Sequence, residues 1–170
     1  MRLETLQTLA IEKTKYFLNL AESMYNVSIP HCNILFNLKG QSAGMAHFFY
    51  GGETHKIRYN RDLLEQEGEV FIETVIPHEV AHIVAQHVFG MRGKNIAHGP
   101  EWKRVMRDFN ADPERCHSFD TSRCAIKRKT YAFKCECKTH AVSSVIAKKI
   151  ANGRNYTCNL CKTRLVKYLG

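Results

Sequence analysis

The sequence predicts an α+β fold in which a mixed domain of helices and short strands is followed by a small metal-binding module. Two long stretches repeat apolar residues at close to the 3.6-residue period of a helix, and three short apolar segments bounded by glycine-containing turns lie between them. Four of the seven cysteines fall in two close pairs near the C-terminus. We therefore expect residues 1–120 to form the main domain, 121–133 a basic connector and 134–170 the small module.

Three segments of the main domain are predicted to be helical. Residues 3–25 carry an amphipathic pattern that ends before Ser28-Ile29-Pro30. Residues 69–89 form a second helix with Gly90 as its C-cap, and Pro77, which has no backbone N–H, should kink or break it. A third helix begins near Pro100, which suits a first turn.

The strands are predicted from short apolar runs bounded by glycine. Residues 32–38, 43–50 and 55–59 fit this description, and we expect them to form one small antiparallel sheet. The C-terminal module is expected to be rich in β-structure.

Composition and charge limit the classes of protein. Hydrophobic residues make up 44% of the chain, and no apolar run approaches the roughly 20 residues that span a bilayer. The N-terminus lacks the apolar segment of a signal peptide, so we expect a cytoplasmic protein that does not bind membranes. Residues 121–170 hold 12 Lys and Arg against one acid, a net of +11, whereas residues 1–120 have a net of −2. This asymmetry indicates a polyanionic partner for the C-terminal third.

The sequence His78-Glu79-Val80-Ala81-His82 indicates a zinc hydrolase. Histidines four apart lie about 40° apart around a helix, so both imidazoles can reach one ion. Glu79 points about 100° away from His78, where it can act as general base on the zinc-bound water. The competing interpretation is a helix with two surface histidines, but the apolar residues on both sides of the motif argue for a buried site.

A catalytic zinc needs a third protein ligand, and two residues compete for this role. Position 88 is valine, which excludes the metzincin spacing, and His87 lies about 140° off the ligand face of the helix. His98 follows a loop and immediately precedes the next helix, so the chain can present it to the metal. Glu101 is the alternative, since some zinc peptidases use a glutamate from a later helix.

The motifs of the main domain resemble those of the SprT family. The matching stretches are Phe71 to His82, Phe89-Gly90, and His98-Gly99-Pro100-Glu101-Trp102-Lys103. The resemblance implies a compact zincin-like metallopeptidase fold with His78, His82 and His98 on zinc, Glu79 as general base, and a C-terminal zinc ribbon. The family's catalytic domain is similar to that of the eukaryotic protease Spartan, which implies protein substrates attached to DNA.

The paired cysteines predict a structural zinc site. Cys158-x2-Cys161 has the spacing of a zinc knuckle, and Cys135-x-Cys137 is one residue shorter. His140 is an alternative ligand in place of Cys135 or Cys137, and unpaired thiols are the competing interpretation. A module of fewer than 40 residues with few large apolar side chains is hard to fold without a metal.

Basic residues alternate with aromatic ones around these cysteines, a combination that suits phosphate contact and base stacking. The simpler interpretation is a solvated charged face. The candidate nucleic-acid-binding residues are Lys127, Arg128, Lys129, Lys148, Lys149 and Arg154.

These observations predict an enzyme with two zinc ions, one catalytic and one structural. We expect a zinc metalloendopeptidase that cleaves DNA-associated or DNA-crosslinked proteins and binds DNA without sequence specificity. The alternative is a nucleic-acid-binding regulatory zinc protein with weak or vestigial peptidase activity. Hydrolysis of a small substrate is a third possibility.

Overall fold

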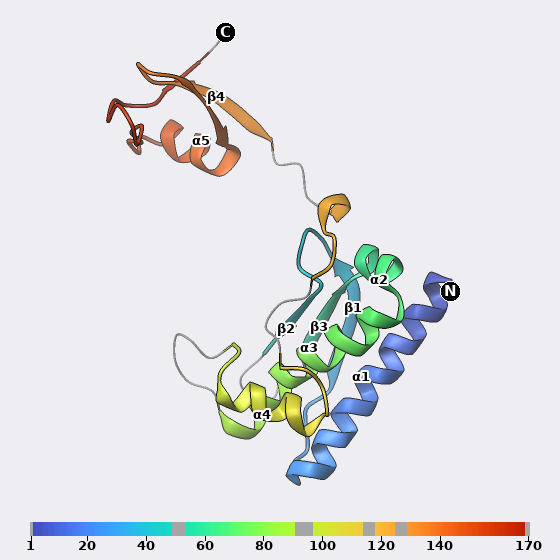
Figure 1. The fold of residues 1–170 in the computed structure, drawn as a ribbon. Coiled ribbons are helices and arrows are strands. Elements are labelled where there is room, and N and C mark those ends of the chain that lie inside the picture. The colour runs from blue at the N-terminus through green and yellow to red at the C-terminus, as the bar shows by residue number, and fades with distance from the viewer. Residues whose placement is uncertain (1, 49–53, 91–96, 114–117, 125–128, 169–170) are drawn as a thin grey trace. The chain divides into compact units, whose positions relative to one another are not determined.

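The computed structural model describes residues 2–48, 54–90, 97–113, 118–124 and 129–168 (Figure 1). The chain divides into two compact units, residues 1–125 and residues 126–170. Both units combine helices with a three-stranded sheet, so the predicted α+β class is confirmed. In the described part of the chain, no helix is long and apolar enough to cross a membrane.

Helix α1 (Leu3–Tyr25) matches its predicted span and packs against helix α3. Its buried residues recur every three or four positions and form one face: Leu6, Ala10, Thr14, Phe17 and Ala21. Thr14 lies among them because its hydroxyl donates to the Ala10 carbonyl at 2.7 Å and lies 2.9 Å from the hydroxyl of Tyr59. The helix ends at Asn26, whose φ of 50° is the left-handed conformation of a C-cap.

The sheet of the first unit has the order β1-β3-β2, with β1 (Cys32–Leu38), β2 (Gly44–His47) and β3 (His55–Asn60). β2 and β3 are antiparallel, but β1 and β3 are parallel, so the prediction of a wholly antiparallel sheet is wrong. Because β3 inserts between the two earlier strands, β1 pairs with β3 and not with its neighbour in sequence. As a result, β2 is an edge strand.

Helix α2 (Arg61–Glu67) follows β3 directly and was not predicted. Asn60 is its N-cap, and its side-chain oxygen accepts hydrogen bonds from the backbone N–H groups of Asp62 at 3.1 Å and Leu63 at 3.4 Å. Asparagine ahead of Leu63-Leu64 was the signal for this helix in the sequence.

Helix α3 (Glu69–Phe89) runs through the centre of the first unit and continues across Pro77, so of the kink or break expected there, the break is absent. The helix loses one backbone hydrogen bond at the proline but is buried along most of its length, including Phe71, Ile76 and Ile83, which are 0% exposed. Packing against α1, β2 and helix α4 (Pro100–Asp108) therefore holds it together. Gly90, in the left-handed conformation with φ of 59°, is its C-cap as predicted.

Helix α4 begins with Pro100 in the first turn, as predicted, and buries Trp102, Val105 and Met106. The hydroxyl of Tyr25 at the end of α1 donates to the Asp108 carboxylate at the end of α4. Beyond α4, Phe119 stacks on Phe71 of α3, and a short 3-10 helix, η1, covers Ser122–Cys124.

The second unit contains β4 (Thr130–Lys134), β5 (Thr139–Ser143), helix α5 (Ser144–Ala151) and β6 (Val166–Lys167). β4 is the central strand and is antiparallel to both neighbours. It starts four residues before position 134, within the expected connector, because Thr130 already pairs with Ser143. Helix α5 was not predicted; its N-cap Ser143 accepts a hydrogen bond from the Ile146 N–H.

Two candidate metal centres

The first candidate centre consists of three histidines. His78 and His82 lie one turn apart on α3, and His98 comes from the turn that leads into α4. Their ring centroids are 4.8–5.0 Å apart, and the Nε2 atoms of His78 and His98 are 3.0 Å apart. One ring nitrogen from each residue lies within 4.8 Å of the other two. The group contains His98 and not Glu101.

The geometry and charge of this group fit a zinc ion. Tetrahedral ligands at 2.0–2.1 Å from zinc are separated from one another by roughly 3.4 Å, close to the 3.0 Å between the Nε2 atoms of His78 and His98. Burial, together with the neighbouring His78 and His98 rings, lowers the pKa of His82 to about 3. The imidazole is therefore neutral near pH 7, which is the form that binds metal. Three nitrogen ligands would leave one coordination position open for water or substrate.

Trp102 supports the three histidines from behind. Its side chain is fully buried, and its ring centroid lies 4.7 Å from those of His78 and His98 and 5.5 Å from that of His82. Its indole N–H donates to the backbone carbonyl of His78 at 3.2 Å. The ring packs against all three imidazoles, and the hydrogen bond additionally ties α4 to the helix turn that carries His78.

Glu79 is buried, with 6% of its surface exposed. Burial raises the pKa of its carboxyl to about 8, and a hydrogen bond from the Ala46 backbone N–H acts in the opposite direction. A carboxyl whose pKa is close to neutral can exchange a proton with substrate at physiological pH.

His78 and Glu79 line a cleft of about 650 Å³ in the first unit. One wall is the segment around the start of β2, from Gln41 to Gly44, and the other is formed by residues that follow α4, including Ala111, Asp112 and Phe119. The first half of α3 contributes Val70, Glu73 and Thr74. One of the three candidate metal ligands, His78, and the buried acid Glu79 thus face a space large enough for a ligand.

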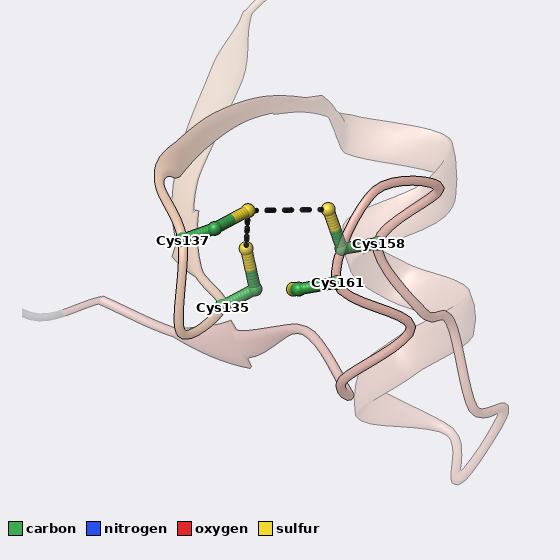
Figure 2. Close-up of side chains that lie close together, drawn as sticks. All are labelled: Cys135, Cys137, Cys158 and Cys161. Carbon is green, nitrogen blue, oxygen red and sulfur yellow. Dashed lines mark hydrogen bonds between the residues drawn. The ribbon is translucent and has the colours of Figure 1, made fainter.

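The second candidate centre consists of the four cysteines of the second unit (Figure 2). Cys135 and Cys137 lie on the turn after β4, and Cys158 and Cys161 on a loop that faces it. The Cys137 sulfur is 3.4 Å from that of Cys135 and 3.7 Å from that of Cys158, and all four sulfurs lie within 4.8 Å of one another. Tetrahedral thiolates on zinc are separated by roughly 3.8 Å, so the set fits a zinc ion.

Hydrogen bonds favour the thiolate form on the second cysteine pair. Backbone N–H groups of Cys161 and Leu160 lower the pKa of Cys158, and the hydroxyl and backbone of Thr163 lower that of Cys161 to about 6. His140 lies beside the group, with Nε2 3.1 Å from the Cys135 sulfur, and does not belong to the set of four.

The predicted nucleic-acid-binding residues occupy different parts of the second unit. Lys127 and Arg128 lie outside the described residues. Lys129 is exposed, with its ammonium 5.5 Å from the centroid of the Tyr131 ring. Lys148, Lys149 and Arg154 are exposed on α5 and the turn that follows it.

The structure also shows a hollow in the second unit that the sequence did not predict. It has a volume of about 730 Å³, and its apolar lining includes Tyr131, Phe133 and Leu165. Three basic residues, Lys148, Arg164 and Lys167, also line it. These residues are far apart in sequence, and only the basic composition of the region pointed to them.

Comparison with known proteins identifies the family. The model of the SprT-like family matches residues 14–129, and the chain belongs to this family. Protein SprT of Pseudomonas paraeruginosa is 35% identical over 153 residues, which is 86% of each chain. Protein SprT of Pasteurella multocida is 35% identical over 151 residues, covering 88% of this chain and 86% of the relative. No solved structure matches the chain.

Proposed function

We propose that this chain is a zinc-dependent metalloendopeptidase with a zincin-like catalytic domain. The observation that carries the proposal is the convergence of His78, His82 and His98, of which His78 lines the same cleft as the buried Glu79. A nitrogen ligand set with an open position and an adjacent carboxyl is the arrangement of zinc hydrolases. Membership of the SprT-like family supports the same assignment.

The chain's own residues would divide the chemistry between them. Zinc held by the three histidines would supply a Lewis acid that polarises the substrate carbonyl and lowers the pKa of an attacking water. Glu79 takes a proton from that water and passes it to the leaving amine, a role suited to a carboxyl with a pKa near neutral. Trp102 holds the His78 turn in place through its hydrogen bond to the backbone carbonyl.

The proposed substrate is a peptide in extended conformation. β2 is one of the two edge strands of the sheet, and residues 41–44, which lead into it, form one wall of the cleft. A peptide can add to such an edge as a further strand through backbone hydrogen bonds. This mode of binding places the scissile bond between β2 and α3 without requiring a particular side chain.

The proposed substrates are proteins associated with or crosslinked to DNA. The net charge of +11 over residues 121–170 favours a polyanion, and the hollow lined by Tyr131, Lys148 and Arg164 combines an aromatic ring with basic groups. In this proposal a structural zinc on Cys135, Cys137, Cys158 and Cys161 holds the second unit as a zinc ribbon. DNA binding would be independent of sequence and would take place in the cytoplasm.

A cleavage assay tests the proposal. Zinc-loaded wild type and Glu79→Gln are incubated with a DNA-binding protein, with and without single-stranded DNA, and products are followed by gel and mass spectrometry. We expect cleavage by wild type, stimulation by DNA, and no cleavage by the variant although it retains its zinc. If the loaded wild type cleaves nothing but binds DNA, the alternative of a regulatory zinc protein with vestigial peptidase activity replaces the proposal.

A further inference from the structure

Backbone conformation does not explain why position 44, the first residue of β2, is occupied by glycine. Among the described glycines, positive φ angles occur at Gly40, Gly68, Gly90 and Gly153, and not at Gly44. Any residue could adopt its extended backbone, and a glycine weakens a strand. Its partner across the sheet is the fully buried Tyr59, so position 44 faces the core, where a side chain would normally be favoured.

The reason lies in a close approach between β2 and α3. A Cβ atom at position 44 would lie 2.4 Å from Cγ, 2.5 Å from Oε1 and 2.6 Å from Cδ of Glu79. Carbon atoms in contact are normally about 3.5–4.0 Å apart. The carboxyl group of Glu79 therefore occupies the space that a side chain at position 44 would take.

Two further contacts hold both sides of this approach in place. The Ala46 N–H, two residues along the same face of β2, donates a hydrogen bond to the Glu79 carboxylate. The start of β2 is anchored by the buried Asn60, whose N–H donates to the Ala43 carbonyl at 2.8 Å and whose side-chain amide donates to the Gly40 and Ser42 carbonyls at 2.8 and 3.1 Å. The strand cannot easily retreat from the helix.

We propose that Gly44 is a positioning residue whose missing side chain leaves a notch in β2 that seats the carboxylate of Glu79. This inference rests on the proposed function, in which Glu79 accepts a proton from the attacking water and donates it to the leaving amine. The strand that seats the acid is also the edge strand beside the cleft. A peptide added to β2 would therefore be held at a fixed distance from Glu79, because one strand positions both.

Replacing Gly44 by alanine tests the catalytic consequence. The methyl group must push the carboxylate away by about 1 Å to reach a normal contact, and a misplacement of that size costs about 100-fold in rate. We expect Gly44→Ala to lower kcat about 100-fold, to change KM by less than about threefold, and to retain both zinc ions. The matched control is Met45→Ala on the same strand, whose side chain is 38% exposed on the opposite face.

The outcomes are distinct. A large loss of kcat in Gly44→Ala with near-normal Met45→Ala supports the proposal. A Gly44→Ala enzyme with wild-type kcat overturns it, and so does an equal loss in both variants, since that would reflect a general perturbation of β2.

A second measurement does not depend on peptidase activity. If the contact is as described, Gly44→Ala lowers the urea midpoint in the presence of Glu79 and lowers it much less in a Glu79→Ala background, where the carboxylate is absent. Unfolding of zinc-loaded protein is followed by circular dichroism for all four combinations. Equal shifts in both backgrounds overturn the proposal, even if the protein proves not to be a peptidase. Coupled shifts support the seating of Glu79 whichever way the cleavage assay turns out.

Discussion

In the metal-free wild type, the free energy of unfolding should fall as pH rises because buried Glu79 becomes ionised. Replacing Glu79 with glutamine should abolish this part of the pH dependence. Burial raises the pKa of Glu79 from the ordinary 4.5 to about 8 in the folded chain. Between these two values the folded state holds a proton that the unfolded state has released. The free energy of unfolding therefore falls with increasing pH across this range, and the contribution that protonated Glu79 makes at low pH is lost by about pH 8.

The expected size follows from the two pKa values. A difference of one pKa unit corresponds to about 1.4 kcal/mol, and most of the interval between the two values lies between pH 5 and pH 8. The wild type should therefore lose about 3 kcal/mol more than Glu79→Gln over that range. Glutamine has nearly the same volume and no charge, so other titrating groups cancel in the comparison.

Urea unfolding of chelator-treated wild type and Glu79→Gln at pH 5, 6, 7 and 8, followed by circular dichroism, measures this difference. The stability of the variant relative to wild type should rise steadily with pH. A constant difference, or one that changes in the opposite direction, would show that the carboxyl is not held in its protonated form by burial.

Three further outcomes are expected. His98→Ala should reduce the zinc content from two ions per chain to one, measured by atomic absorption; retention of both would argue against His98 as a ligand. Cys158→Ser should also lose one zinc, and cleavage of a DNA-free peptide should remain within about threefold of wild type; loss of both ions would contradict two independent centres. Lys148→Gln combined with Arg164→Gln should weaken single-stranded DNA binding and reduce the slope of log affinity against log salt by roughly 1.4. The control Lys15→Gln, on α1, should change neither the affinity nor the slope. An unchanged slope in the double variant would exclude the hollow as a phosphate-binding surface.

The predictions that depended on local sequence agree best with the structure. Residues 3–25 and 69–89 are helical because their apolar residues repeat with the helical period, and the spacing of His78 and His82 brings their rings together on one turn. The turn before α4 brings His98 to the same place, as the order of loop and helix suggested. The paired cysteines converge as well, because each pair is a local unit.

Features that depend on pairing between distant segments could not be predicted in the same way. The strand order β1-β3-β2 is decided by which strand edges meet in the folded chain, and hydrophobic alternation does not encode it. The contact of Gly44 with Glu79 joins residues 35 positions apart, and a glycine in a strand has several possible explanations when only the sequence is known. Of the kink or break expected at Pro77, the break is absent for a related reason, since tertiary packing outweighs the loss of one helical hydrogen bond.

The position of Trp102 gives the chain a natural optical probe. It is the single tryptophan of the sequence, and its ring lies within 4.7–5.5 Å of all three histidine rings while the second unit contains none. A cobalt(II) or copper(II) ion bound by the histidines would quench its emission at contact distance. The intrinsic fluorescence of the unlabelled protein should therefore report loading of the histidine centre directly.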